Sequence, residues 1–305
     1  MNKIKIKNTD LEASRIALGC MRLTERTQAE ADELISQCLD MGINFFDHAD
    51  IYSGGKCEEM FGEFLKANPS ARDRMIVQSK CGIRKGYFDF SKEHITESVE
   101  GSLKRLNTDR LDVLLLHRPD ALVEPEEVAE AFTSLNKSGK VRYFGVSNQN
   151  PMQIELLKKY LPQKIVINQL QLSIVHNSMI RSGINVNMEN TSAVNRDGGI
   201  LDYCRLNDIT IQPWSPFQYG FFEGVFLNNE KFPELNKKID EIAEKYNVTN
   251  TAIAIAWLLR HPAKMQPILG TTRLSRVKDA IKADEINLTR PEWYALYISA
   301  GNILP

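Results

Sequence analysis

Residues 111–117 read LDVLLLH, and this short segment is the strongest single indication of the architecture. From Val113 to Leu116 the residues are apolar without alternation, so both faces of a strand here would be buried. Strands of this kind are typical of parallel sheets that helices cover on both sides. Segments with helical periodicity flank it at residues 91–106 and 124–137. The segment therefore predicts one unit of an α/β protein with a parallel sheet.

The same alternation of strand-like and helix-like segments continues in both directions. A capping-box pattern at Thr27 and Glu30 begins a helix that Gly42 ends. Further helices are predicted at residues 151–160, 251–261 and 291–300. Eight strand candidates alternate with the helices, at residues 16–19, 43–47, 75–80, 111–117, 141–146, 164–168, 209–213 and 266–269. Eight β/α units predict one domain over residues 1–305, a (β/α)8 TIM barrel. A doubly wound sheet is the alternative, but no G-x-G-x-x-G motif follows the first strand.

Two regions stand apart from this alternation. Near the start, residues 3–7 and 13–18 flank the turn residues 8–10, which predicts a short N-terminal β-hairpin. Residues 176–199 lack periodicity, are rich in asparagine and exceed the roughly 12–15 residues of an ordinary loop. Because long loops of this kind are usually functional, we expect residues 176–199 to act as a lid over a bound ligand.

Composition and charge argue against several classes of partner. The 38 Lys and Arg residues nearly balance the 39 Asp and Glu residues, so nucleic acid is not an expected partner. No run approaches the roughly 18 apolar residues of a membrane span, and the first residues alternate charged with apolar side chains, so we expect a cytoplasmic protein without a membrane partner. The five cysteines are widely spaced and form no C-x-x-C pair, and we predict no metal. No feature specifies an oligomeric state.

Four polar residues follow or end predicted strands and are the candidates for chemistry: Asp47, Tyr52, Lys80 and His117. In a (β/α)8 barrel the reactive groups come from the carboxyl-terminal ends of the strands. Singly, each residue has an ordinary structural explanation, such as a turn, a helix cap or a lysine that reaches to water. Together, a carboxylate, a phenol, an amine and an imidazole at one end of a barrel can transfer protons.

The same residues match a known family in order and spacing. The segment GINFFDHADIY at residues 42–52, followed by Lys80 and then by HRPD at residues 117–120, resembles the active site of the aldo-keto reductases, most closely their bacterial oxidoreductases. Later segments also resemble that family, namely GVSN at residues 145–148, Gln169, WSP at residues 214–216 and GTT at residues 270–272 with Arg276. This resemblance implies a barrel that binds NADP(H) and reduces a small-molecule carbonyl substrate.

The resemblance also implies a role for each catalytic residue. Tyr52 would be the general acid, and the Lys80 ammonium beside it would lower the pKa of the phenol. Asp47 would keep Lys80 protonated in a desolvated site, where an unpaired ammonium is disfavoured. His117 would donate a hydrogen bond to the substrate carbonyl.

By the same resemblance, a further group of residues would hold the cofactor. Ser147, Asn148 and Gln169 would grip the nicotinamide carboxamide, and Trp214 would stack on the nicotinamide ring. The turn before a helix at residues 270–272, with Arg276, would hold the adenosine phosphate and favour NADPH over NADH. The complete expected set is Met21, Asp47, Ser147, Asn148, Gln169, Trp214, Ser215, Pro216, Phe217, Gly270, Thr271, Thr272 and Arg276.

Two other functions remain compatible with these residues. In a Schiff-base aldolase, Lys80 would be the nucleophile rather than the electrostatic partner of Tyr52. In a cofactor-sensing binding subunit with the reductase fold, the cofactor would bind without turnover. The complete set of four catalytic residues favours the enzyme.

Overall fold

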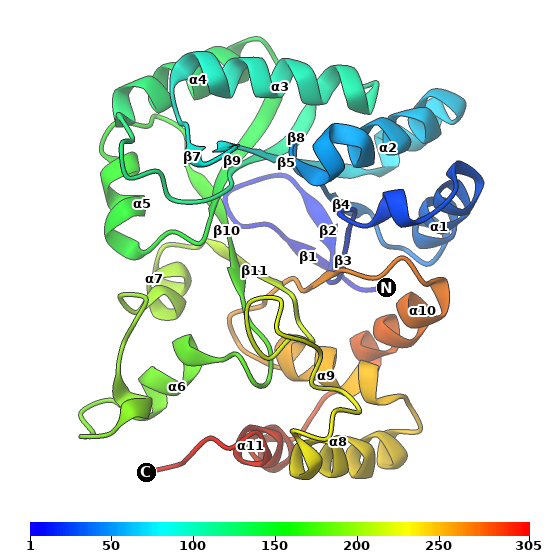
Figure 1. The fold of residues 1–305 in the computed structure, drawn as a ribbon, viewed down its shortest axis with the longest axis vertical. Helices are drawn as coiled ribbons and strands as arrows, with labels where there is room; N and C mark the ends of the chain where they lie inside the picture. The colour runs from blue at the N-terminus through cyan, green and yellow to red at the C-terminus, as the bar shows by residue number, and fades with distance from the viewer.

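The computed structural model describes residues 1–305 and shows eight parallel strands in a barrel surrounded by helices (Figure 1). Neighbouring strands follow the order β11, β10, β9, β8, β5, β4, β3 and β12. Their bounds are β3 (Ala17–Gly19), β4 (Phe45–Asp47), β5 (Ile76–Cys81), β8 (Leu111–Leu116), β9 (Val141–Ser147), β10 (Ile165–Gln171), β11 (Thr210–Trp214) and β12 (Ile268–Leu269). Between β11 and β12 the Gln266 backbone N–H donates to the Ile211 carbonyl at 3.0 Å. The predicted (β/α)8 barrel is therefore confirmed.

Strand β8 shows why its sequence lacks alternation. All six of its residues are buried. Val113 and Leu115 belong to a small apolar cluster inside the barrel, whereas Leu114 and Leu116 belong to the large cluster that includes the surrounding helices. Because successive side chains of a strand point to opposite faces, both faces of β8 are in contact with apolar neighbours.

The helices follow the strands as predicted, with some that the sequence patterns did not single out. The Thr27 hydroxyl and the Glu30 carboxylate form the predicted capping box. The helices are α1 (Gln28–Asp40), α2 (Lys56–Ala67), α3 (Lys92–Leu106), α4 (Pro125–Lys137), α5 (Pro151–Lys158), α6 (Ser178–Ile184), α7 (Ile200–Leu206), α8 (Pro233–Tyr246), α9 (Asn250–Leu259), α10 (Leu274–Ile281) and α11 (Arg290–Ser299). Helices α2, α6, α7 and α8 were not predicted, although α2 buries Cys57, Phe61 and Leu65 at helical spacing. None of the helices has the length and apolar character needed to cross a membrane.

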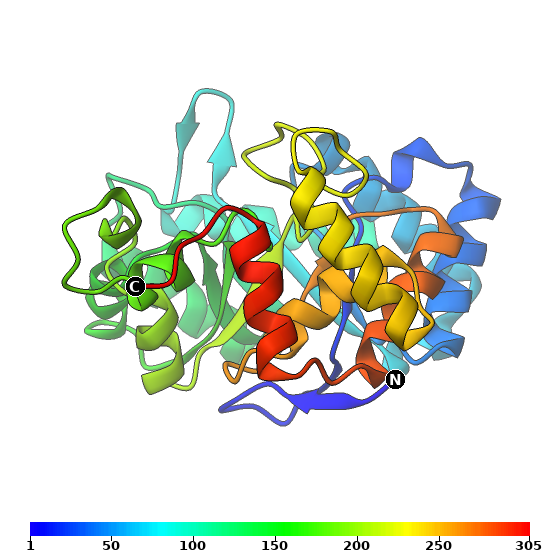
Figure 2. The same cartoon turned by 90° about the horizontal axis from the view of Figure 1, so that it is seen from below.

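The predicted N-terminal hairpin is present and lies under the barrel. Strands β1 (Lys3–Lys5) and β2 (Glu12–Ser14) pair antiparallel. Ile6, Leu11 and Ala13 are buried with residues of the barrel interior, so the hairpin covers the amino-terminal ends of the strands. A second hairpin, β6 (Ile83–Arg84) with β7 (Tyr87–Phe88), projects from the opposite end (Figure 2). The hairpin therefore closes the amino-terminal end of the barrel interior and leaves the carboxyl-terminal ends of the strands uncovered by it.

The prediction that residues 176–199 form an aperiodic loop is wrong in part. The segment contains helix α6 and a 3-10 turn at Thr191–Ala193. Met179, Ile180 and Ile184 line a cavity of about 380 Å³ together with α11 side chains, so α6 lies beside α11 on the outside of the barrel (Figure 1). A seven-residue helix is too short to show clear periodicity, which explains why the sequence pattern missed it. This position does not support the expected lid.

Candidate active site

The four expected catalytic side chains converge at the carboxyl-terminal ends of three neighbouring strands. Asp47 ends β4, Lys80 lies in β5 and His117 directly follows β8. Because β4 pairs with β5 and β5 with β8, these positions are adjacent in the sheet although they are far apart in the sequence. Tyr52 lies in a short 3-10 turn, η2 (Tyr52–Gly55), just beyond β4. The structure therefore brings all four residues together.

Lys80 is the centre of the group. Its side chain is fully buried. Its Nζ donates to the Asp47 carboxylate at 2.8 Å, to the Tyr52 hydroxyl at 3.0 Å and to the His48 carbonyl at 2.6 Å. These three contacts use all three N–H bonds of the ammonium. The amine is thus held in place with its hydrogen directed at the Tyr52 oxygen.

The electrostatics of this group differ in one respect from the expectation. Burial is the largest single influence and opposes the charge on Lys80, but the Asp47 carboxylate and the Tyr52 hydroxyl together outweigh it and raise the pKa of Lys80 above its usual value. Burial also raises the pKa of the Tyr52 phenol, and this effect exceeds the lowering by the Lys80 ammonium. Lys80 therefore lowers the Tyr52 pKa as expected, but desolvation of the phenolate is the larger effect, which the sequence did not predict. At neutral pH Tyr52 retains its proton and Lys80 retains its charge.

His117 stands beside Tyr52, with the two ring centroids 6.0 Å apart and the rings nearly perpendicular. Burial, Lys80 and Arg118 together hold the pKa of His117 well below its usual value. The imidazole is therefore neutral at neutral pH, with one N–H donor. Its Nδ1 atom is buried and has no hydrogen-bond partner.

A series of buried glutamines supports Asp47 from inside the barrel. Gln78 donates to the Asp47 carboxylate at 2.6 Å, and Gln169 donates to it at 3.1 Å. Both amides also donate to the Gln212 side chain, at 2.9 and 3.2 Å. Gln212 in turn donates to Gln266 at 2.8 Å. Gln78, Gln212 and Gln266 were not predicted as site residues, yet a glutamine inside a predicted parallel-sheet strand is a signal that sequence reasoning can use.

The turn that carries Tyr52 has an unusual backbone. Ser53, Gly54 and Gly55 have φ values of 50°, 64° and 91°, in the left-handed region. A Cβ atom on Gly55 would approach the Arg105 side chain to 2.7 Å. Arg105 is fixed by its ion pair with the fully buried Glu58 at 2.8 Å. The glycine at position 55 is therefore required both by its backbone angle and by this close approach.

The residues expected to grip the nicotinamide form one hydrogen-bonded group. The Ser147 hydroxyl donates to the Gln169 carbonyl at 3.1 Å, and the Asn148 amide donates to Ser147 at 2.7 Å. The Trp214 indole N–H donates to the Asn148 side chain at 3.2 Å. Residues from the ends of β9, β10 and β11 thus meet beside the catalytic group. The side-chain amide of Gln169 also donates to Asp47 and Gln212.

The remaining expected cofactor residues line a groove of about 520 Å³ next to the catalytic group. They are Met21, Ser215, Pro216, Phe217, Gly270, Thr271, Thr272 and Arg276. Three further arginines that were not predicted, Arg22, Arg26 and Arg273, line the same groove. Arg26 donates to the Thr272 hydroxyl at 3.1 Å, so the loop after β3 is hydrogen-bonded to the loop after β12. A groove with four arginines fits a ligand with several negative charges.

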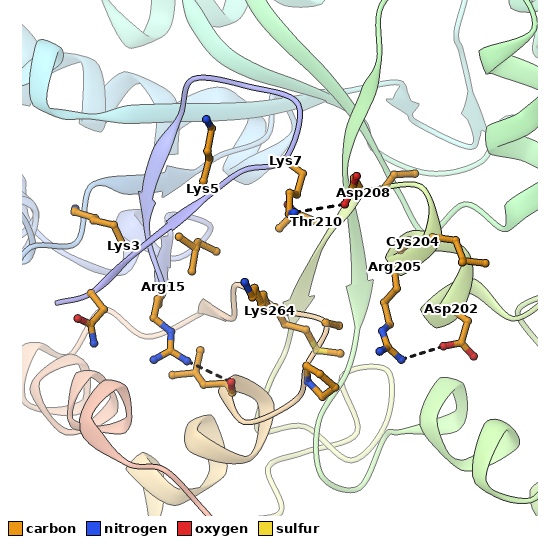
Figure 3. Close-up of a pocket in the computed structure, with 18 residues that line it drawn as sticks. Lys3, Lys5, Lys7, Arg15, Asp202, Cys204, Arg205, Asp208, Thr210 and Lys264 are labelled. Atoms are coloured by element: carbon orange, nitrogen blue, oxygen red, sulfur yellow. Dashed lines mark hydrogen bonds and ion pairs between the residues drawn. The ribbon is translucent and has the colours of Figure 1, made fainter.

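A larger cavity lies at the other end of the barrel. It has a volume of about 1250 Å³ and is lined by hairpin residues, the end of α7 and the segment before β12 (Figure 3). None of the expected site residues lines it. Two of its four lysines, Lys3 and Lys5, lie on edge strand β1, where charged side chains prevent unwanted strand pairing. Cavity size therefore does not identify the site. The site is identified by the strand ends that carry Asp47, Lys80 and His117.

Comparisons with known proteins identify the family of the chain. The model of the Aldo/keto reductase family matches residues 15–297. The uncharacterized oxidoreductase YcsN of Bacillus subtilis is 37% identical, with 97% of each chain covered. A 6-dehydroglucose reductase of Agrobacterium fabrum is 35% identical, with 95% of each chain covered. A crystal structure of a thermostable aldo-keto reductase with the inhibitor epalrestat superposes with a TM-score of 0.79 at 26% identity, covering 98% of this chain and 100% of that one.

The chain therefore belongs to the aldo/keto reductase family. Its relatives are oxidoreductases, and the fold and the family support carbonyl reduction as its chemistry.

Proposed function

We propose that the protein is an NADP(H)-dependent oxidoreductase that interconverts an aldehyde or ketone and the corresponding alcohol. The observation that carries the proposal is the Lys80 ammonium, which bridges the Asp47 carboxylate and the Tyr52 hydroxyl at the carboxyl-terminal end of the barrel. It supports a site that can give a proton to a bound oxygen atom.

Tyr52 is the proton donor in this proposal. Its phenol is protonated at neutral pH, and the Lys80 N–H at 3.0 Å stabilises the phenolate that forms as the proton leaves. Asp47 keeps Lys80 charged, and the buried glutamines Gln78 and Gln169 hold Asp47. His117, neutral and beside Tyr52, donates its N–H to the carbonyl oxygen and orients it.

The cofactor would lie in the groove that continues from the catalytic group. Ser147, Asn148 and Trp214 are the residues we assign to the nicotinamide end, and the four groove arginines to the phosphates. When bound in reduced form, a nicotinamide would supply a hydride to the carbonyl carbon, while Tyr52 and His117 act on the carbonyl oxygen. Preference for NADP(H) is assigned to Arg276, which is exposed in the groove and has no protein partner.

The Schiff-base alternative fits the geometry less well. A nucleophilic lysine must lose its proton, and the Asp47 carboxylate opposes that loss. All three hydrogens of Lys80 already have acceptors. Borohydride treatment in the presence of a carbonyl compound should therefore leave Lys80 unmodified.

The proposal is tested by NADPH consumption with a panel of aldehydes, ketones and quinones. We expect turnover with at least one of these classes and a slower rate with NADH at equal concentration. Tight NADPH binding with no turnover on any of them would instead favour the cofactor-sensing subunit.

A further inference from the structure

Arg118 is a half-buried arginine at the mouth of the barrel that has no acceptor in the protein. Its guanidinium lies over the Trp214 ring at 5.4 Å and over the Phe221 ring at 5.6 Å. Arg118 follows β8 and Trp214 ends β11, and two strands separate β8 from β11 in the sheet. The side chain therefore reaches across the opening through which a substrate must approach the catalytic group.

Two other arginines that are buried or half-buried are used differently. Arg72 contacts the Asp112 carboxylate at 2.9 Å, and Arg105 contacts the Glu58 carboxylate at 2.8 Å. Each is thus neutralised by a buried acid, as partly desolvated charges usually are. Arg118 has aromatic contacts in place of a carboxylate, so its five N–H donors remain available.

The charge of Arg118 is felt at the catalytic residues. It is one of the groups that lower the pKa of His117, and the Tyr52 phenol in turn acts on the pKa of Arg118. A group bound to Arg118 would consequently lie only a few bonds from a carbonyl that Tyr52 and His117 hold. The exposed rings of Phe221 and Phe222, both in contact with Trp214, form an apolar wall beside this position.

We infer that Arg118 determines specificity and selects carbonyl substrates that carry a carboxylate group near the reacting carbonyl. The planar fork of a guanidinium matches the two oxygens of a carboxylate, and one guanidinium neutralises its single charge. A phosphate dianion would need a second free cation. Lys80 cannot serve as this cation, because all three of its hydrogens already bond to protein acceptors. The inference rests on the proposed reduction, because it names the substrate class of that same site.

The test compares two aldehydes that differ mainly in charge, 4-carboxybenzaldehyde and its methyl ester. The wild-type enzyme should give a kcat/KM at least ~10-fold higher for the acid than for the ester, as a charge-assisted hydrogen bond pair implies. In Arg118→Met this ratio should fall to about one, and in Arg118→Lys it should be intermediate, because a point charge lacks the fork. Arg205→Met is the matched control, since Arg205 is exposed and pairs with Asp202 at the other end of the barrel.

Equal kcat/KM values for acid and ester in the wild type, or an unchanged ratio in Arg118→Met, would overturn the inference while leaving the reductase intact. Glyceraldehyde 3-phosphate and glyceraldehyde form a second pair, and a preference for the phosphate alone would overturn the assignment to carboxylates.

A binding measurement separates this inference from the proposed function. If no aldehyde is reduced, the proposed function fails, and calorimetric titration with terephthalate in the presence of NADP+ then decides on Arg118. Binding that Arg118→Met weakens by ~10-fold or more supports the carboxylate site. Equal binding by both proteins contradicts it.

Discussion

Charged or polar side chains lie at both ends of strand β8, and those at its start have more hydrogen-bond and ion-pair partners than those that follow it. At its start, Asp112 is 1% exposed and accepts from Arg72 and Arg142, each at 2.9 Å. At its other end, His117 has a buried Nδ1 atom without a partner, and the Arg118 guanidinium lies over two aromatic rings and forms no ion pair. One strand thus joins a fully paired charge network to a group of side chains with free donors.

The difference separates structure from chemistry. Paired charges at the amino-terminal end can contribute to folding and leave nothing for a ligand to bind. Free donors at the carboxyl-terminal end reduce stability or leave it unchanged, and they are available to a substrate. Substitutions at the two ends should therefore affect different measured quantities.

The largest effect is expected for Asp112→Asn at the amino-terminal end. Loss of the carboxylate charge leaves Arg72 and Arg142 without their buried partner, which should lower the free energy of unfolding by about 3 kcal/mol. Chemical denaturation measures this change in the free energy of unfolding. Asp109→Asn, which alters an exposed acid, is the control and should leave the midpoint unchanged. A stable Asp112→Asn protein would show that this network is not structural.

Tyr52→Phe, at the carboxyl-terminal end, should lower activity and leave stability unchanged. Removing the hydroxyl takes away the proton donor, so kcat should fall at least ~10²-fold while NADPH affinity and the unfolding midpoint are retained. Tyr143→Phe is the matched control, because Tyr143 donates to Asp10 at the amino-terminal end. Full activity in Tyr52→Phe would eliminate the proposed mechanism.

Asp50 tests whether an incompletely satisfied acid near the carboxyl-terminal end reduces stability. Burial, then Glu58, raises the pKa of Asp50 to about 6, and its Oδ1 atom has no partner. The unfolded chain ionises first as the pH rises, so the folded state loses stability between about pH 4 and 6. Asp50→Asn should remove this loss and stabilise the protein by about 2 kcal/mol at pH 7.5, with no gain at pH 4.

The matched control for Asp50 is the exposed residue Asp40. Asp40→Asn should show no such pH-dependent gain in denaturation at the two pH values. If Asp50→Asn destabilises the protein at pH 7.5, the carboxylate has partners that the contacts described above do not include.

The smallest effect is expected in the cofactor groove. Arg276→Ala should weaken NADPH binding by about 10-fold and NADH binding much less, because only NADPH carries the additional phosphate. Fluorescence titration with both cofactors measures this, with Lys278→Ala as a control on the same helix. An equal loss for both cofactors would show that Arg276 does not read the 2′-phosphate.

Much of this architecture could be predicted from the sequence, for identifiable reasons. Apolar segments without alternation, such as β8, predict strands buried on both faces and hence a parallel sheet. The polar residues that follow such strands indicate the catalytic end. The groove arginines Arg22, Arg26 and Arg273 could not be assigned, because they come from loops whose positions depend on the closed barrel. The net rise in the Tyr52 pKa was missed because burial is not visible in the sequence. Helix α6 was too short to show a pattern.

The central claim is that the Tyr52 site reduces a carbonyl with hydride from a nicotinamide. NADPH deuterated at C4 and an aldehyde that the enzyme accepts test this claim directly, because mass spectrometry of the alcohol reports the origin of the new hydrogen on carbon. We predict one deuterium per molecule of alcohol from the wild type and an alcohol yield at least ~10²-fold lower from Tyr52→Phe. An alcohol without deuterium, or the same yield of deuterated alcohol from Tyr52→Phe, would contradict the account.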